Sequence, residues 1–442
     1  MNEFSQFSLL TQRRFAPFFW TQFLGAFNDN VYKNALIVYI TFQGAALTTM
    51  KTSVMVNICA GLFILPFFIF AATAGQFADK YPKSLMVRWV KAFEVVISGF
   101  VALAFYFNHM FLLVFALFLL GVQATIFSPV KYSILPHYLP LEHELIAGNA
   151  WVESGTFLAI LMGTLLGGLL IAAQNGPFLV SLAVFILALL GLITSLFIPS
   201  VPSAAPELKI HWNIFKETMR NLQFAKQNQT VFLSILGISW FWAYGGAVLT
   251  IIPGLGRDVL HGNEHVVTLL LMTFSVGIAM GGYLFSRLSA GQLELGLVPL
   301  GSFGTTIMAI HLYWILHGMV ESTVTYDVST FLAQSTHWWV LLDCLLLGIF
   351  GGLYTVPLYT LLQMRSEATV RSRIIATNSI LNGLFMVLAA GLCAVAFAMG
   401  LTIAQLFLAI AVVNVMAAAY IFTLLPEFFA RFIVWARLHL HL

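Results

Sequence analysis

The sequence predicts an all-α membrane protein of about twelve transmembrane helices in two six-helix halves, and three observations support this fold class. Apolar residues make up 60% of the 442 residues and charged residues only 8%, whereas soluble domains are about 25% charged. The chain contains a series of apolar runs of roughly 20 residues, the length that crosses a bilayer as a helix. Lys and Arg gather in the loops on one side of these runs. The pattern argues against a soluble enzyme, and a net charge of only +3 gives no basis for binding nucleic acid.

Each apolar run is expected to be a helix, because backbone polar groups in lipid must pair within their own segment and the runs lack the alternation of barrel strands. We predict spans at residues 16–42, 53–77, 84–107, 110–130, 148–172, 177–199, 229–254, 266–288, 295–318, 337–362, 373–399 and 401–425. The N-terminus lacks the basic, apolar and small-residue regions of a signal peptide, so the first span is expected to stay in the mature protein.

The loop charges predict that both termini are cytoplasmic. With that orientation most Lys and Arg residues lie on the inner side, and only Lys51 and Arg257 fall in outer loops. A polar stretch at 200–228 separates six spans from six. The predicted organisation is therefore an N-terminal bundle at 1–199, a cytoplasmic linker at 200–228, a C-terminal bundle at 229–425 and an amphipathic, interfacial tail at 426–442.

Neither a metal centre nor a bound cofactor is predicted. The three cysteines lie in apolar runs, which favours packing over disulfides or metal ligation: Cys59, Cys344 and Cys393. Two histidine pairs lack the further Cys or acidic ligands that a metal site needs: His261 with His265, and His439 with His441. We find no phosphate-binding glycine loop, nucleophile elbow or zinc motif, so we expect neither an enzyme nor an ATP-driven pump.

The loop between the second and third spans carries a candidate gate. Gly75, Asp79, Lys80 and Lys83 resemble the loop signature of the major facilitator superfamily, in which a glycine is followed by an acid and two bases. Gly75 allows close helix approach, and Asp79 can cap a helix N-terminus or pair with a base. Such a loop can lock one conformation and release another. The alternative is a solvated turn.

The first span carries charge near its centre. Asp29 and Lys33 share a helix face with Gln22, and Asn30 lies beside them. A charge at bilayer depth costs about 2.5–3.5 kcal/mol on insertion scales, so these side chains are expected to face the protein interior or a wet cavity. They can form an ion pair kept for packing, an anchor for a charged substrate headgroup, or a coupling-ion site.

Other polar side chains of the first half are further candidates. Lys131 closes the fourth span, where it can be a gating residue or only a positive-inside anchor. Asn149 and Glu153 lie one turn apart on the fifth span, and Glu153 is the harder to explain by packing. Lys91 and Glu94 form a predicted intramembrane pair on the third span, either structural or part of the gate.

The two halves of the chain repeat a pattern. Pro129 is expected to end the fourth span and Pro357 lies near the end of the tenth. Asn149 and Asn378 follow at almost equal spacing, and Glu153 matches Asn382. Duplicated six-helix halves are the architecture of major facilitator transporters, so the resemblance implies that fold, with Asn378 and Asn382 near the substrate.

The second half is apolar and aromatic, with Asp343 as its main intramembrane charge. Trp240, Trp242 and Tyr244 follow one another on the seventh span, either as packing residues or as part of a binding surface. A substrate with a charged head and an apolar tail would suit a polar first half and an apolar second half.

Several segments resemble bacterial lysophospholipid transporters. They are Gln22–Asn30 on the first span, Ser128–Tyr132 on the fourth, Gly148–Ser154 on the fifth, and Ser239–Trp242 with Gly351–Gln363 in the second half. The Asn28–Lys33 version is closest to the transporter part of transporter–acyltransferase fusion proteins. The resemblance implies movement of lysophosphatidylethanolamine to the cytoplasmic leaflet of the bacterial inner membrane. An acyltransferase, with an acyl-carrier-protein synthetase as a further partner or fused domain, would reacylate it there.

Alternatives remain open at this stage. A drug efflux pump of the same superfamily is one, although the Gly-Pro expected before Gly167–Gly168 is replaced by Leu165–Leu166. A membrane enzyme would need a nucleophile or metal constellation that we do not find. A non-transporting anchor for an acyltransferase would not need Asp29 in the membrane. The coupling ion, proton or sodium, is unknown.

Overall fold

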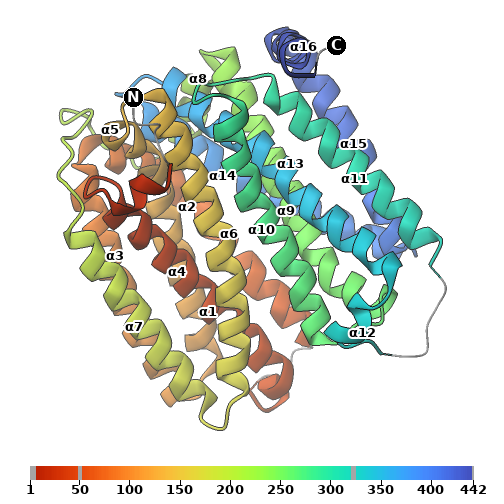
Figure 1. The fold of residues 1–442 in the computed structure, drawn as a ribbon. Helices are drawn as coiled ribbons and strands as arrows, with labels where there is room; N and C mark the ends of the chain where they lie inside the picture. The colour runs from red at the N-terminus through yellow and green to blue at the C-terminus, as the bar shows by residue number, and fades with distance from the viewer. Residues whose placement is uncertain (1–5, 48–51, 320–324, 441–442) are drawn as a thin grey trace. The chain divides into compact units, whose positions relative to one another are not determined.

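The computed structural model describes residues 6–47, 52–319 and 325–440, and Lys51 and His441 lie outside these ranges. Helices account for nearly all regular structure in the described ranges, and the one pairing of extended backbone there is an isolated bridge between Gly262 and Tyr326. Figure 1 shows the helices in chain order. The predicted all-α fold class is confirmed.

Every predicted span is a helix. They are α1 (Ala16–Leu47), α2 (Thr52–Lys80), α3 (Lys83–Tyr106), α4 (Met110–Ser133), α6 (Glu142–Ala172), α7 (Gly176–Leu196), α9 (Gln229–Gly254), α10 (Glu264–Leu288), α11 (Leu297–His317), α13 (Ser335–Arg365), α14 (Arg371–Ala398) and α15 (Ile403–Leu424). By length and composition, 11 of these helices in the described ranges qualify as membrane spans. The exception is α1, whose 32 residues are long enough but include the polar run around Asp29.

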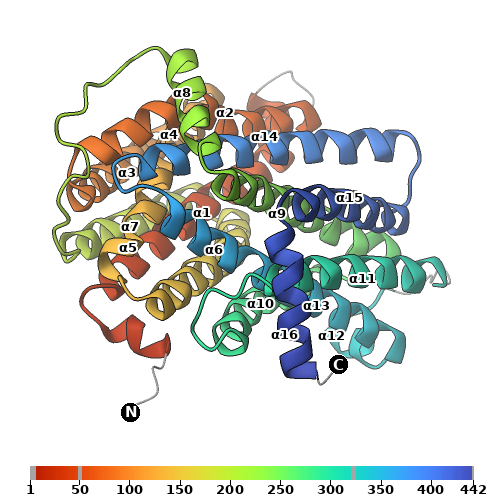
Figure 2. The same ribbon diagram turned by 90° about the horizontal axis from the view of Figure 1, so that it is seen from above.

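Shorter helices lie between or after the spans. They are η1 (Gln6–Thr11), α5 (Leu135–Tyr138), α8 (Ile214–Lys226), η2 (Leu255–Val259), α12 (Val328–Leu332) and α16 (Pro426–Leu440). Helix α8 forms within the predicted linker and packs beside α2 (Figure 2). The Asn213 side chain caps its N-terminus by accepting from the Lys216 N–H. The predicted amphipathic tail is α16.

The helix ends differ from the prediction at the fourth span. Pro129 was expected to end that helix, but α4 continues through Pro129 to Ser133, so the expectation is wrong. Pro357 likewise lies inside α13, which runs to Arg365. Proline is tolerated inside membrane helices because neighbouring helices and small local adjustments satisfy the carbonyl that it frees.

The chain divides into two compact units. One comprises residues 1–140, 155–228 and 363–383, and the other comprises 141–154, 229–362 and 384–442. In the first unit α2 packs on α4, while α3 packs on both α4 and α7. In the second unit α11 packs on α15. The linear bundles at 1–199 and 229–425 remain a prediction, since short pieces of α6, α13 and α14 are assigned to the unit that holds the other half of the chain.

Two glycine pairs at the i,i+4 spacing that allows close helix approach, Gly163 with Gly167 and Gly277 with Gly281, bring helix backbones together. In the first unit a Cβ added to Gly167 would collide with the Val31 carbonyl oxygen, and one on Gly163 with Phe27. In the second unit a Cβ on Gly281 would collide with the Ile349 carbonyl oxygen. Glycine at these positions therefore sets the contact of α6 with α1 and of α10 with α13.

Candidate functional site

A buried polar cluster lies in the first unit around Glu94. Its carboxylate accepts hydrogen bonds from Lys91 Nζ at 2.6 Å, Gln123 Nε2 at 2.8 Å and Asn28 Nδ2 at 2.9 Å. Glu94 and Lys91 are both 0% exposed. The Lys91 ammonium lies against Gly25, where any side chain would collide with it. The predicted intramembrane pair of α3 is therefore confirmed as a contact, and it also joins α1 and α4.

Asp29 adds a second carboxylate to this cluster. It interacts electrostatically with Glu94, Lys91 and Lys33, so two acids and two bases share one region of the first unit. Its Oδ1 is buried and accepts no hydrogen bond from the described residues. The Lys33 ammonium lies 5.5 Å from the centre of the Phe63 ring. No direct Asp29–Lys33 ion pair forms within the described ranges, so Asp29 Oδ1 is buried there without a polar partner.

The other polar residues near α1 are tied to the helices around them. Asn30 donates from Nδ2 to the Ala26 carbonyl oxygen at 2.8 Å, and its Oδ1 is buried without a hydrogen bond in the described structure. Lys131 donates from Nζ to Thr156 Oγ1 at 2.8 Å, and Thr156 donates to Gln22 Oε1 at 3.3 Å. A chain of hydrogen bonds thus runs from Lys131 on α4 through Thr156 on α6 to Gln22 on α1.

The predicted asparagines and Glu153 occupy separate units. Asn149 donates from Nδ2 to Thr360 Oγ1 at 3.1 Å inside the second unit, and Glu153 is buried one turn later on α6. Asn378 is buried in the first unit, and its Oδ1 has no hydrogen bond from the described residues. Asn382 is half-buried on α14. Asn378 and Asn382 thus share the first unit with Asp29, whereas Asn149 and Glu153 belong to the second unit.

The aromatic residues of α9 are engaged inside the second unit. Trp240 donates from Nε1 to Asn414 Oδ1 at 2.6 Å, and Trp242 donates to the Tyr359 hydroxyl at 3.0 Å. Tyr244 is buried, and its hydroxyl has no hydrogen bond in the described ranges. Trp240, Tyr244 and Asn414 line a cavity of about 10 Å³, which is close to the volume that one water molecule needs. A lipid tail does not fit there as the helices stand.

The residues of the predicted gate contact the start of α14, and the contacts of Asp79 with Ser372 and Arg373, here called the latch, join α2 to α14 within the first unit. Asp79 Oδ2 lies 3.1 Å from Arg373 Nε, and Asp79 Oδ1 accepts the Ser372 backbone N–H at 3.0 Å. Both side chains are buried. Asp79 therefore does both things that its sequence position predicts: it pairs with a base and caps the positive end of a helix.

Neighbouring contacts reinforce this latch. Gly75 lies against α14, because a Cβ there would stand 2.9 Å from Arg373 Cα and Ala376 Cβ. Ser372 Oγ donates to Ser133 Oγ at 3.0 Å, and Ser128 shares a 2.7 Å hydrogen bond with Ser379. The hydrogen bonds of α4 reach residues 239 and 251 positions further along the chain, and those of Asp79 on α2 reach residues 293 and 294 positions further.

The two lysines of the loop differ. Lys83 is 1% exposed and interacts electrostatically with Asp79, whereas the Lys80 ammonium is half-buried and lies over the Tyr81 ring at 5.9 Å. Lys83 thus belongs to the buried charge network of the latch, while Lys80 lies outside it.

The partners of the predicted residues are less evident from the sequence than the residues themselves. Arg373, Gln123 and Asn414 were not among the predicted site residues. Gln123 and Asn414 are each a lone polar residue in an apolar run, and this pattern could have identified them from the sequence. Asp343 also has a partner: His311 Nδ1 lies 2.8 Å from its Oδ2. Within the described ranges there is no group of three or more His, Cys, Asp or Glu placed to hold a metal ion.

Comparison with known proteins finds one family model and several relatives of the same name. The model of the Major Facilitator Superfamily matches residues 18–390. The lysophospholipid transporter LplT of Escherichia fergusonii is 26% identical over 389 residues, covering 86% of this chain and 88% of that protein. LplT of Klebsiella pneumoniae is 28% identical over 391 residues (86% and 87%), and LplT of Photorhabdus laumondii is 26% identical over 413 residues (91% and 93%).

Solved structures of low sequence identity share the fold. The Escherichia coli fucose:proton symporter matches with a TM-score of 0.68 and 12% identity, covering 94% of this chain and 98% of that one. The human organic anion transporter MFSD10 matches with a TM-score of 0.72 and 13% identity, covering 93% and 99%. At this identity the likeness speaks only for the fold.

Proposed function

This chain belongs to the major facilitator superfamily, and we propose that it is a secondary transporter of lysophospholipids. The observation that carries the proposal is the similarity to proteins named lysophospholipid transporters over 86–91% of the chain. A buried charge cluster on otherwise apolar helices supports it, because charges at membrane depth are costly and are kept for function.

The proposed headgroup site is the region of Asp29. Its free carboxylate oxygen can accept a hydrogen bond from the ammonium group of an ethanolamine headgroup, and Lys33 and Lys131 can pair with the phosphate. Asp29 is also the proposed site for a coupling proton or sodium ion. Glu153, Asn149, Asn378 and Asn382 are proposed to contact the substrate at other stages of transport.

The acyl chain would follow the apolar, aromatic surface of the second half of the chain. Trp240, Trp242 and Tyr244 are the proposed contacts there, and the small volume of the present cavity means that helix movement must precede their contact with a lipid tail. The proposed direction is toward the cytoplasmic leaflet of a bacterial inner membrane, with both termini cytoplasmic. An acyltransferase, separate or fused to a relative of this chain, would then restore the second acyl chain.

The Asp79–Arg373 latch is the proposed gate. It holds the start of α14 on α2 through a buried ion pair and a capped helix N-terminus, and hydrogen bonds of Ser128 and Ser133 hold α14 on α4. Releasing α14 breaks these contacts together, so the latch would separate two states of the transporter. The network of Lys91 and Glu94 is proposed to hold α1, α3 and α4 as one rigid group while that happens.

Substrate identity is tested by reconstituting the protein in vesicles with fluorescent lysophosphatidylethanolamine and measuring the fraction that bovine serum albumin can extract from the outer leaflet over time. The proposal predicts protein-dependent loss of the extractable pool, with little movement of a cationic dye. Equal movement of unrelated amphipathic dyes would replace the proposal with a drug pump. No movement of either, from folded protein, would favour a non-transporting anchor.

A further inference from the structure

A histidine and an aspartate meet between two spans of the second unit and take no part in the function proposed above. His311 on α11 places its Nδ1 2.9 Å and 2.8 Å from the two carboxylate oxygens of Asp343 on α13. The Asp343 side chain is 2% exposed and the His311 side chain is 44% exposed. Ionisable side chains within membrane spans are costly and are usually kept for function, so this pair needs an explanation of its own.

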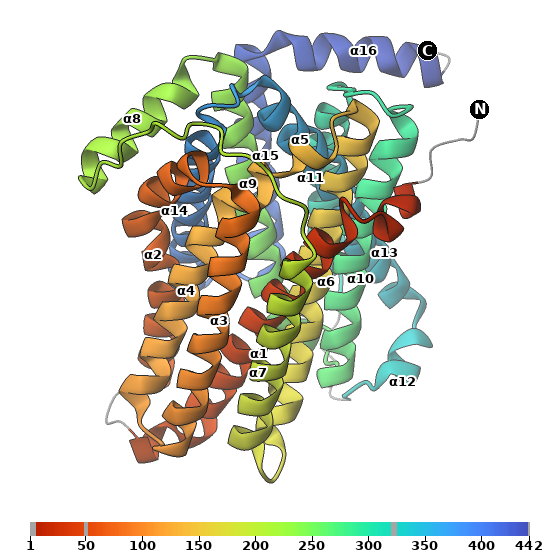
Figure 3. The ribbon, with the colours of Figure 1, turned by 90° about the vertical axis from the view of Figure 1, so that its left-hand side faces the viewer.

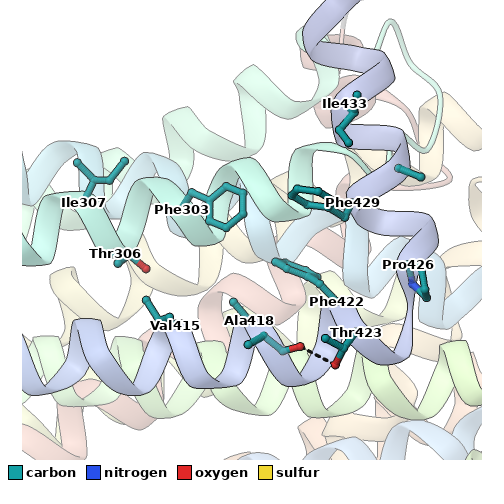
Figure 4. A pocket seen from close by; sticks show the side chains of 12 residues that line it. Phe303, Thr306, Ile307, Val415, Ala418, Phe422, Thr423, Pro426, Phe429 and Ile433 are labelled. Atoms are coloured by element: carbon teal, nitrogen blue, oxygen red, sulfur yellow. Dashed lines mark hydrogen bonds between the residues drawn. The ribbon is translucent and has the colours of Figure 1, made fainter.

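The face of α11 that carries His311 is otherwise apolar. Phe303, Ile307 and His311 follow one another at four-residue spacing, so they lie along one side of the helix. Phe303 and Ile307 line an apolar pocket between α11 and α15 (Figure 4). The hydroxyl that α11 adds to this lining, on Thr306, already donates to the Ser302 carbonyl oxygen at 3.0 Å. Packing against apolar neighbours therefore gives no reason for a titratable side chain in this row.

His311 and Asp343 interact with few other ionisable groups. Within the described ranges, the electrostatic partners of Asp343 are His311 and the Cys344 thiol. The ionisable groups on the packed helices make no hydrogen bond or ion pair with either member of the pair in the same ranges. They include Tyr244 on α9, Glu264 and His265 at the start of α10, His317 on α11, His337 on α13 and Tyr420 on α15. The charge of the pair is therefore set by its own protons.

The geometry leaves one nitrogen of His311 free to take a proton. A carboxylate oxygen can only accept a hydrogen bond, so Nδ1 carries the hydrogen toward ionised Asp343 and the lone pair of the neutral imidazole lies on Nε2. Nε2 has no hydrogen bond from the described residues, and its side chain is partly exposed. With His311 neutral the pair carries one net negative charge, whereas a proton on Nε2 makes it a neutral ion pair. Because net charge within a span is costly, the added proton stabilises the pair.

The pair lies near the end of the second unit that is opposite α16. His311 stands six residues before the end of α11, or about 9 Å at 1.5 Å per residue, and Asp343 stands eight residues after the start of α13. Helix α12, which precedes α13, lies at this end and α16 at the other (Figure 3). Exposed Trp314 and Trp338 mark the same end, and the Trp339 ring lies 6.0 Å from that of His311. Tryptophan gathers where the bilayer meets water, so protons from that side are close to Nε2.

The pair is also the polar link between two tightly packed helices. A Cβ added to Gly301 would stand 2.7 Å from the Phe350 carbonyl oxygen, and one on Gly304 would collide with the Phe350 ring, so α11 and α13 are in close contact there. Within the described ranges, the His311–Asp343 contact is the one side-chain hydrogen bond between α11 and α13. The charge state of the pair therefore acts on how firmly these two spans hold together at this end.

We propose that His311 and Asp343 form a proton-binding site that couples proton movement to the opening of the α11–α13 contact. With a proton on Nε2 the pair is an ion pair and holds the two helices together. When the Nε2–H bond breaks and the proton passes to water, the attraction falls to that of a neutral imidazole for a carboxylate. Asp343 then gains from contact with water, and the helices part at the end away from α16. The inference rests on the proposed transport function and names the proton as its coupling ion, at a site additional to Asp29.

Proton binding is tested first without any lysolipid. The full chain, with 15N-labelled histidine, would be studied by NMR in detergent micelles, and His311→Gln would assign the signals of His311. We expect the Nε2 proton to be lost and regained as the pH is varied across the range in which the protein stays folded, while Nδ1 keeps its hydrogen. Asp343→Asn should weaken proton binding by about tenfold or more, because the charge that faces the proton is gone. A His311 that keeps one protonation state throughout, or binds its proton equally well in Asp343→Asn, would overturn the proposal.

Coupling is tested in vesicles that contain the protein and a pH-sensitive dye, with lysophosphatidylethanolamine added outside. We expect the parent to move protons together with the lysolipid, and His311→Gln and Asp343→Asn to lose most of the proton movement per lysolipid moved. The double variant, with His311→Gln and Asp343→Asn together, has no charge to bury and keeps a hydrogen bond, so it should fold and be equally uncoupled. His317→Gln is the matched control, because His317 is exposed on the same helix and stacks on Tyr313, and it should couple as the parent does.

The two experiments separate this inference from the proposed function. Lysolipid movement without protons in the parent, or full proton movement in the double variant, would overturn the proton site and leave the lysolipid transporter standing. A parent that moves no lysolipid would contradict the proposed function, and the NMR titration of His311 would then decide the proton site by itself.

Discussion

Replacing Glu94 by Gln is predicted to destabilise the protein strongly while changing almost nothing in side-chain size. Glu94 accepts three hydrogen bonds and is the direct counter-charge of Lys91, and both side chains are 0% exposed. Removing one partner of a buried ion pair costs about 3–5 kcal/mol, because the other charge stays buried. We therefore expect Glu94→Gln to lower the free energy of unfolding by that amount, measured by denaturation in mixed micelles of dodecyl sulfate and a mild detergent.

The paired replacement separates charge from packing. Lys91→Met with Glu94→Leu removes both charges, and such replacements of a buried pair are often neutral or stabilising. The double variant should therefore recover most of the stability that Glu94→Gln loses. The reasoning is refuted if the single variant unfolds within about 1 kcal/mol of the parent, or if the double variant is the less stable of the two.

Three further changes test other contacts by the same unfolding measurement. Asp79→Asn should lower the free energy of unfolding by about 3–5 kcal/mol, because it leaves Arg373 buried without its carboxylate. Lys80→Gln, outside the latch, should change it by no more than about 0.5 kcal/mol, and an equal loss of stability in both variants would show that Asp79 is not part of the latch. Gly167→Ala should lower the free energy of unfolding by about 1–3 kcal/mol, because the added methyl group forces α6 away from α1. Gly168→Ala, whose methyl group meets open space, should be neutral or stabilising. An unchanged stability in Gly167→Ala would contradict the close contact. Trp240→Phe should cost about 1–3 kcal/mol by leaving Asn414 Oδ1 buried without its donor, and no loss would show that this hydrogen bond is dispensable.

Much of the fold follows from the sequence because the membrane imposes it. An apolar run of about 20 residues has few alternatives to a helix, so every predicted span appears, and the small-residue spacing at Gly163 and Gly167 correctly predicts close packing. The charges of α1 and α3 were identifiable for the same reason, since a lipid environment makes each of them costly.

The partners of those residues are not readable from the sequence, because they depend on tertiary packing. Asp79 predicts a cap and an ion pair, but nothing near it in the sequence indicates Arg373, 294 positions away. Trp240 and Trp242 form an aromatic run that suits a binding surface equally well, and only the hydrogen bonds to Asn414 and Tyr359 show how they are used in this conformation. Pro129 misled the prediction because a soluble-protein rule was applied to a membrane helix.

The central claim is that Asp29 offers a buried carboxylate to a lysolipid headgroup, and Asp29→Ala tests it most directly. The albumin-extraction assay with lysophosphatidylethanolamine would compare the parent, Asp29→Ala and Glu153→Ala in vesicles with equal amounts of folded, inserted protein. The account predicts that both variants lose protein-dependent movement of the lysolipid. Movement at the rate of the parent in Asp29→Ala would contradict it.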